Sequence, residues 1–273
     1  MDDDIIGIIP SGGLGKRMKP FRAFKELTTV GSRIYESNGE MREIPKVLGE
    51  YTIENMVRAG VSNLVIVINE NKSELLRFYG NGSQYKTNIV YACQDMDSDL
   101  YGMPVAFEEA YPWIRNKTVF MGMPDTIVLP FECFEVLYDV HKENKSDLTL
   151  GVFPTDNPQS LAPVEYDLKT KRVLKIYDKP KEIDINNTWN IAIWSKRFTE
   201  LIHEYYCEEL SKVQDKKEII LSDIFNLAIH RNFEVFCHFF AEGQCFDLGN
   251  IKEYNSTKLM VENSSLLYRN SVV

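Results

Sequence analysis

The sequence has no surplus of basic residues. Its 273 residues include 31 Lys and Arg against 40 Asp and Glu, which gives a formal net charge of −9. Proteins that bind nucleic acid through general charge present a basic face, so this balance argues against a nucleic-acid partner. A small anionic substrate is still compatible with it, because a phosphate site needs only a few local cations and backbone N–H groups.

Membrane and secretion signals are missing as well. No apolar run approaches the roughly 20 residues that cross a bilayer, and the first residues, Met-Asp-Asp-Asp, have the wrong charge for a signal peptide. The five cysteines are odd in number and no pair has CxxC spacing, so neither a disulfide framework nor a zinc site is expected. We therefore expect a cytoplasmic protein with no membrane partner.

The first half of the sequence alternates strand and helix patterns. Residues 5–9 form a nearly unbroken β-branched run, which is typical of a strand buried on both faces in a parallel sheet. Further strands are predicted at 63–69, 88–93 and 118–121, and helices at 51–59, 72–79 and 105–113. This alternation predicts an α/β fold with a doubly wound, mostly parallel mixed sheet.

The second half changes character. Short strands broken by turns are predicted at 147–153, 162–167, 172–177 and 189–194, and they indicate a small, partly antiparallel layer that could bind a substrate. Helices at 197–213, 221–230 and 251–265 and a strand at 233–239 follow. Because the sequence has no internal repeat and no Pro/Gly/Ser-rich linker, one continuous domain is predicted.

A glycine-rich turn, Gly12-Gly13-Leu14-Gly15-Lys16-Arg17, follows the first predicted strand. Glycines let the backbone come close to a phosphate, and consecutive N–H groups at such a turn favour an anion. Lys16 and Arg17 add positive charge, and Arg17 can bind a phosphate bidentately. The spacing is that of neither a Walker A loop nor a GxGxxG dinucleotide fingerprint. The simpler alternative is a tight turn whose Lys and Arg are only solvated.

This turn, with Pro20 after it, resembles the GGxGxRxxP signature of the sugar-1-phosphate nucleotidylyltransferases, close to the glucose-1-phosphate thymidylyltransferase type. The resemblance implies a Rossmann-like nucleotidyltransferase fold and a Mg²⁺-dependent enzyme. Its partners would be an NTP, dTTP or UTP, and a sugar 1-phosphate. It also implies a single nucleotidyltransferase domain over 1–273, in which 1–130 mainly binds the nucleotide, 131–250 mainly binds the sugar phosphate, and 251–273 is a C-terminal helix.

The resemblance assigns roles to residues in order along the chain. The implied catalytic residues are Arg17, Lys25 and Asp125. The implied Mg²⁺ ligands are Asp125 and Asp247. The implied nucleotide-binding residues are Gly12, Gly13, Gly15, Lys16, Arg17, Gln94 and Gly102. The implied substrate-binding residues on the sugar side are Asp178, Lys179, Trp189 and Asn190.

Several positions depart from the family pattern. Leu161-Ala162 stand where Tyr-Gly is usual, Asp178 replaces a glutamate, and Ala192 replaces a glycine. Because these departures cluster around the expected sugar, they predict a changed sugar pocket. The segment 33–49 is additional to the pattern, and either a flap over the site or a contact in a homo-oligomer would account for it.

Two other functions stay open at this point. One is a cytidylyl- or guanylyltransferase that acts on another phosphorylated small molecule, such as a polyol or aminoalkyl phosphate, because a shared fold does not determine the substrate. The other is a catalytically silent relative that binds nucleotide-sugars. The presence of Arg17 and Asp125 argues against the silent relative.

Overall fold

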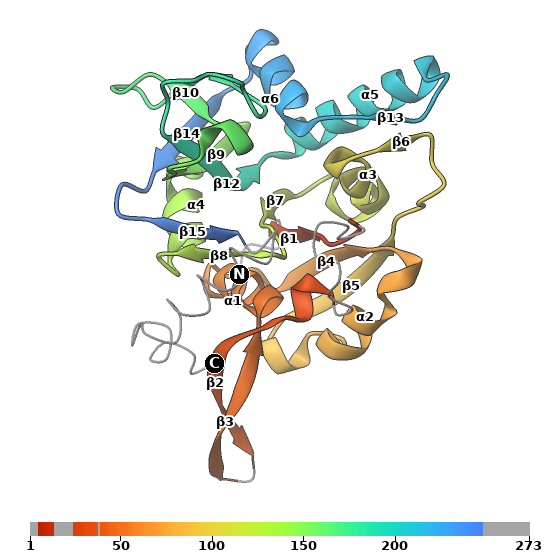
Figure 1. Ribbon diagram of the computed structural model, residues 1–273, viewed down its shortest axis with the longest axis vertical. Helices are drawn as coiled ribbons and strands as arrows, with labels where there is room; N and C mark the ends of the chain where they lie inside the picture. The colour runs from red at the N-terminus through yellow and green to blue at the C-terminus, as the bar shows by residue number, and fades with distance from the viewer. Residues whose placement is uncertain (1–4, 14–23, 38, 248–273) are drawn as a thin grey trace.

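The computed structural model of the chain describes residues 5–13, 24–37 and 39–247 and contains a seven-stranded sheet in the order β14-β9-β12-β7-β1-β4-β5 (Figure 1). The strands of this sheet are β1 (Ile5–Pro10), β4 (Asn63–Ile68), β5 (Asn88–Cys93), β7 (Thr118–Met121), β9 (Leu148–Pro154), β12 (Asn187–Trp194) and β14 (Val235–Phe239). Strand β12 runs antiparallel to both of its neighbours, and every other pair is parallel. The predicted α/β fold with a mostly parallel mixed sheet is confirmed.

Helices cover both faces of this sheet. They are α1 (Leu48–Arg58), α2 (Ser73–Tyr79), α3 (Met103–Ile114), α4 (Cys133–Glu143), α5 (Lys196–Lys212) and α6 (Leu221–His230). Ile6 and Ile8 of β1 belong to the core cluster that includes α3, α5 and α6. Ile5 and Ile9 belong to the opposite cluster, with α1, α2 and α4. Burial on both faces explains why the first strand is apolar without alternation.

Among the described residues, four two-stranded pairs lie outside the main sheet. They are β2 (Thr29–Ser37) with β3 (Glu40–Val47), β6 (Leu100–Tyr101) with β13 (Lys217–Glu218), β8 (Thr126–Leu129) with β15 (Gln244–Asp247), and β10 (Val164–Tyr166) with β11 (Val173–Ile176). The pair β6–β13 is parallel and the other three are antiparallel. The β10–β11 pair corresponds to the small antiparallel layer predicted from the second half of the sequence. Short 3-10 helices occur at η2 (Lys25–Leu27), η3 (Glu70–Lys72), η4 (Ser83–Tyr85) and η5 (Pro158–Ser160).

The predicted helices at 51–59, 72–79, 105–113, 197–213 and 221–230 are present as α1, α2, α3, α5 and α6. Helix α4 was not predicted, although Cys133, Phe134, Leu137 and His141 form its buried face at helical spacing. The predicted helix at 251–265 lies outside the described residues. In the part of the chain that the structure describes, no helix combines the length and apolar character needed to cross a membrane.

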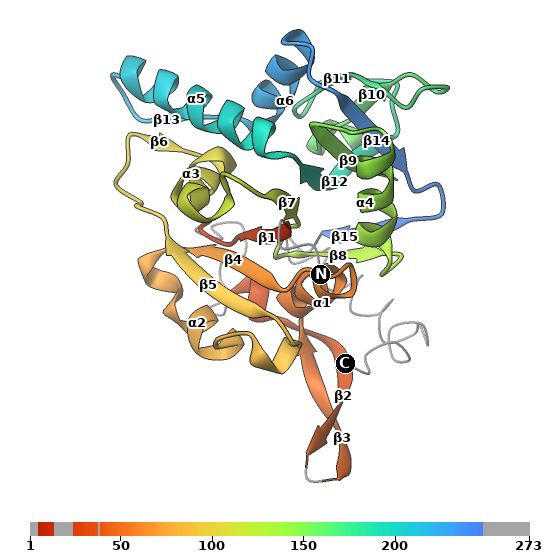
Figure 2. The same cartoon turned by 180° about the vertical axis from the view of Figure 1, so that it is seen from behind.

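The additional segment 33–49 belongs mostly to the antiparallel ribbon β2–β3 and ends in the first turn of α1. Figures 1 and 2 show this ribbon projecting away from the sheet and its helices. Exposed hydrophobic side chains on it include Ile34 and Met41. Its role as a flap or as a contact between copies stays a prediction.

Candidate functional site

The carboxyl ends of β1, β4, β5 and β7 meet at one edge of the sheet, because these four strands are parallel neighbours. Ligands of open α/β sheets bind at this edge. The segments that follow these strands contain Gly12, Asn69, Gln94 and Asp125. Three of these four residues were predicted from the sequence to belong to the site.

The first part of the glycine-rich turn is held by hydrogen bonds to the neighbouring strand β4. The Ser11 N–H donates to the Val67 carbonyl at 2.7 Å, and the Asn69 side-chain amide donates to the Gly12 carbonyl at 2.7 Å. Asn69 is buried, so its side chain holds the backbone of the turn from the protein interior. Asn69 was not predicted from the sequence, where its only signal is its place at the end of a predicted strand. Gly15, Lys16 and Arg17 lie outside the described residues.

Gly12 and Gln94 lie directly against each other. A Cβ atom added at Gly12 would overlap Oε1 of Gln94, so any larger residue here would require the Gln94 side chain to move. The Gln94 N–H donates to the Ile68 carbonyl at 2.7 Å, and its side chain is mostly buried. A cavity of about 260 Å³ opens beside it, lined by Glu70, Cys93, Gln94, Asp95, Met96 and Asp97.

Gly102 precedes helix α3 and has a φ of +118°. A Cβ atom at this position would overlap the Ile219 carbonyl oxygen, and the Ile219 N–H donates to the Tyr101 carbonyl at 2.9 Å. The pairing of β6 with β13 therefore gives a structural reason for glycine here. The predicted contact of Gly102 with a base stays a prediction.

Lys25, Asp125 and Asp247 converge from three distant segments. Lys25 begins the 3-10 helix η2, Asp125 directly precedes β8, and Asp247 ends β15 opposite Thr126 in the β8–β15 pairing. The Lys25 ammonium and the Asp125 carboxylate form a half-buried ion pair. Burial lowers the pKa of Lys25, but the hydrogen bond to Asp125 and the charges of Asp125, Glu26 and Asp247 outweigh this effect and hold the pKa above its usual value.

The loop that contains Asp125 packs on helix α1. The Thr52 hydroxyl of α1 donates to the Met123 carbonyl at 2.7 Å, and the Thr52 methyl group lies against Gly122. Thr52 thereby fixes the approach to Asp125 without touching its carboxylate. Thr52 was not predicted from the sequence, because a threonine inside a predicted helix has no functional signal.

The four residues predicted to bind the sugar lie on two segments, the stretch after β11 and strand β12. Asp178 and Lys179 follow β11 and are exposed, and Lys179 has a φ of +42°, which is uncommon for a non-glycine residue. Burial raises the pKa of Asp223, at the start of α6, and the charge of Asp178 raises it further. The structure thus places Asp178 near the first turn of α6.

Trp189 and Asn190 lie in β12, where the pairing with β9 shifts register between Trp189 and Ile191. Such a bulge redirects a side chain out of the regular ladder. The Trp189 ring packs edge-on against Phe225, with centroids 5.2 Å apart. Trp189 Nε1 and Asn190 Oδ1 are buried and have no hydrogen-bond partner in the part of the chain that the structure describes. Buried polar atoms without partners are rare in native proteins and indicate a water or a ligand.

Comparison with known proteins identifies the family of the chain. A family model described as nucleotidyl transferase matches residues 6–264. The bifunctional protein GlmU of Thermodesulfovibrio yellowstonii (strain ATCC 51303 / DSM 11347 / YP87) is 24% identical over 239 residues. This match covers 86% of the chain but only 47% of GlmU, so the chain spans about half the length of that relative.

Two solved structures share the fold. A Bacillus anthracis protein assigned as a glucose-1-phosphate thymidylyltransferase, in complex with sucrose, has a TM-score of 0.78 at 16% identity, over 95% of this chain and 96% of that one. A UDP-glucose pyrophosphorylase complexed with UDP-glucose has a TM-score of 0.73 at 14% identity, over 95% of this chain and 98% of that one. The chain belongs to the nucleotidyl transferase family, and the two structures confirm the fold that the resemblance to sugar-1-phosphate nucleotidylyltransferases implied.

Proposed function

We propose that this enzyme joins a nucleoside triphosphate, dTTP or UTP, to a sugar 1-phosphate and releases pyrophosphate. The observation that carries the proposal is the convergence of Lys25, Asp125 and Asp247. They lie at the sheet edge that also holds Gly12 against Gln94. A phosphate-binding turn and a charged cluster at one sheet edge are what nucleotidyl transfer requires.

In this reaction, an oxygen of the sugar 1-phosphate attacks the α-phosphorus of the triphosphate. The bond from the α-phosphorus to the oxygen that bridges to the β-phosphate breaks, and pyrophosphate leaves. The attacking oxygen is already an anion, so no strong general base is needed. The protein has to bring two anions together and stabilise the charge on the transferring group. Lys25, with Arg17 and the N–H groups of the glycine-rich turn, would supply that stabilisation.

The donor set at the site fits Mg²⁺. This cation prefers oxygen ligands and is usually held by one or two carboxylates together with substrate phosphates. The Asp125 carboxylate already faces a cation, the Lys25 ammonium, and Asp247 lies opposite Thr126, the residue after Asp125. When bound, Mg²⁺ would neutralise charge on the α-phosphate. Among the described residues, no group of three or more His, Cys, Asp or Glu could hold a metal ion, so phosphate oxygens and water would complete its coordination.

The sugar would bind beside β12. Trp189 Nε1 offers a buried donor and Asn190 Oδ1 a buried acceptor, each without a partner in the described chain. A sugar hydroxyl both donates and accepts, and can therefore satisfy either atom. Asp178 would accept from another hydroxyl, and Lys179 would offset the charge of the sugar phosphate.

One observation favours a second candidate, a cytidylyl- or guanylyltransferase. The cavity beside Gln94 is lined by three carboxylates, those of Glu70, Asp95 and Asp97. Carboxylates accept hydrogen bonds from exocyclic amino groups, which cytosine and guanine have and which thymine and uracil lack. The same sheet edge and the same chemistry serve both candidates.

A substrate panel tests the proposal and separates the two candidates. dTTP, UTP, CTP and GTP are each paired with sugar 1-phosphates, a polyol phosphate and an aminoalkyl phosphate, and pyrophosphate release is measured with Mg²⁺ and with EDTA. We expect Mg²⁺-dependent release with dTTP or UTP and a sugar 1-phosphate. Release only with CTP or GTP would establish the second candidate, and no release from any pair would favour a catalytically silent protein.

A further inference from the structure

Glu26, the residue after Lys25, is a buried acid with a buried partner. Its side chain is 1% exposed and that of Lys72 is 3% exposed, and Lys72 Nζ lies 2.5 Å from Glu26 Oε1. We propose that the Glu26–Lys72 ion pair is a positioning device that aims Lys25 at Asp125. This inference rests on the proposed role of Lys25 in nucleotidyl transfer.

The geometry of η2 couples the two side chains. Lys25 and Glu26 are consecutive in this single turn, which is closed by hydrogen bonds from Leu27 N to Phe24 O and from Thr28 N to Lys25 O, both 3.0 Å. From this turn, Lys25 contacts Asp125 and Glu26 contacts Lys72. Because one short rigid turn carries both residues, a displacement of Glu26 displaces Lys25 as well.

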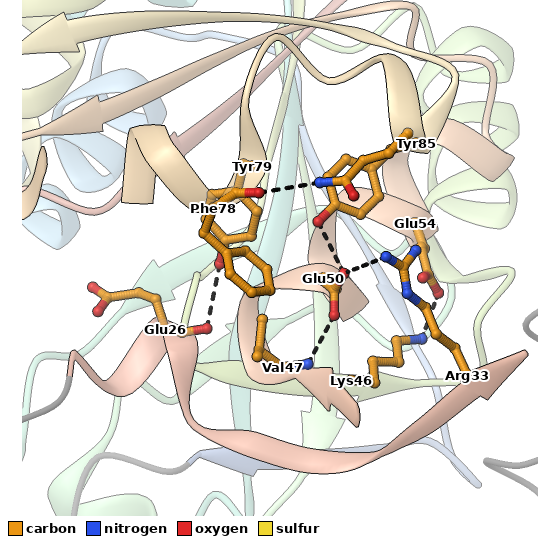
Figure 3. A network of polar contacts seen from close by, with 10 residues as sticks. Glu26, Arg33, Lys46, Val47, Glu50, Glu54, Phe78, Tyr79 and Tyr85 are labelled. Carbon is orange, nitrogen blue, oxygen red and sulfur yellow. Dashed lines mark hydrogen bonds and ion pairs between the residues drawn. The ribbon is translucent and has the colours of Figure 1, made fainter. Parts of the chain in front are cut away.

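The main chain of Glu26 is anchored to the same part of the fold as its side chain. The Tyr79 hydroxyl donates to the Glu26 carbonyl at 3.3 Å (Figure 3). Tyr79 ends helix α2, and Lys72 directly precedes that helix. The two ends of the segment 72–79 therefore hold Glu26 at two points, and α2 acts as the support for η2.

The energetics favour a positioning role over a purely stabilising one. Burial removes the hydration of both charges. A protein in which well-packed apolar residues of similar size replace a buried ion pair is often as stable as the original or more stable. The other oxygen of Glu26, Oε2, is buried without a hydrogen-bond partner among the described residues, and so is Oε1 of Glu54 in a second buried Lys–Glu pair, so what distinguishes the Glu26–Lys72 pair is its place next to Lys25. A directional contact next to a catalytic residue gives such a pair a physical function.

The chain contains a matched control, the ion pair between Lys46 and Glu54. It also joins a lysine and a glutamate, with side chains 3% and 13% exposed. It lies at the base of the β2–β3 ribbon, beside the cluster in which Glu50 binds Arg33 and Tyr85 (Figure 3). Lys46 Nζ lies 3.9 Å from the centre of the Tyr51 ring. The Lys46–Glu54 pair reproduces the burial and chemistry of the Glu26–Lys72 pair without adjacency to Lys25.

The test compares the double variants Glu26→Gln/Lys72→Met and Glu54→Gln/Lys46→Met in the full chain. Both remove a complete pair, so neither leaves an isolated buried charge. Urea unfolding measures stability, and kcat and KM are measured with the most active substrate pair of the wild type. We expect kcat of the Glu26 double variant to fall about 10²-fold, as for a misplaced catalytic group, with a smaller change in KM. The Glu54 double variant should lose much less kcat than the Glu26 double variant at a similar loss of stability.

A crystal structure of the Glu26 double variant adds a measurement that does not depend on turnover. We expect Lys25 Nζ to leave Asp125 in that structure. A folded double variant that keeps both the Lys25–Asp125 contact and the wild-type kcat would overturn the proposal. If the wild type releases no pyrophosphate from any pair, the proposed function fails, and the Lys25–Asp125 contact in the variant still decides whether Glu26 and Lys72 position Lys25.

Discussion

At the residue scale, Asp125 keeps Lys25 charged in a half-buried place. Burial alone would lower the pKa of Lys25, and the contact with Asp125 contributes most to reversing that shift. Removing the charge of Asp125 without changing its shape therefore tests whether this contact matters for the reaction. An asparagine has nearly the same shape as an aspartate but no negative charge.

We expect Asp125→Asn to leave the protein folded and to reduce kcat by about 10²- to 10³-fold, the usual loss when one electrostatic group of a preorganised site is removed. Pyrophosphate release at saturating substrates and Mg²⁺ measures the change. Asp139→Asn is the control, because Asp139 lies on the exposed face of α4. A folded Asp125→Asn enzyme with wild-type turnover would show that Asp125 has no role in the reaction.

At the element scale, the joint between β6, β13 and α3 depends on one glycine. Gly102 combines a φ of +118° with close approach to the Ile219 carbonyl. This backbone contact ties the start of α3 to the segment between α5 and α6.

Gly102→Ala should lower the free energy of unfolding by roughly 1–3 kcal/mol, because a side chain is strained at this φ and also meets the Ile219 carbonyl. Urea denaturation of the purified variant measures the loss. Gly80→Ala provides the comparison, since Gly80 has a φ of +58° but open space around its missing Cβ. Equal losses for the two variants would mean that backbone strain alone, and not the contact with Ile219, explains the glycine at 102.

At the scale of the whole molecule, His141 links helix α4 to the central sheet. Its Nδ1 lies 2.9 Å from the Thr149 hydroxyl in β9, and both residues are buried. Burial lowers the pKa of His141 to about 4, against a weaker opposite effect of Asp147. The folded protein therefore holds His141 neutral at pH values where an unfolded chain would protonate it.

The sign of the resulting pH dependence follows from proton binding. Between pH 6.5 and about 4 the unfolded chain binds more protons at His141 than the folded protein does, so stability falls as the pH falls through this window. The two pKa values differ by an amount that corresponds to roughly 3 kcal/mol. Urea unfolding at pH 7 and pH 4.5 should show a clearly smaller pH effect for His141→Gln than for the wild type. Parallel pH curves for the two proteins would contradict this assignment.

The amino-acid sequence alone determined the class of fold, and it predicted the order of the candidate site residues. Both depend on local pattern: a β-branched run ending in glycines, regular alternation of strands and helices, and short motifs around Lys25, Asp125 and Asp247. Such patterns are visible because neighbouring residues in the sequence share one element and one face. Even so, helix α4 was missed, although its buried face has helical spacing.

Only the tertiary structure showed how the site is held in place. Asn69 reaches Gly12 across 57 residues, Thr52 reaches Met123 across 71, and Lys72 reaches Glu26 across 46. Nothing in the neighbouring sequence marks these three residues as buried contacts, because asparagine, threonine and lysine are usually solvent-exposed. The packing of separate helices and strands determines their partners, because it brings together side chains that are far apart in the sequence.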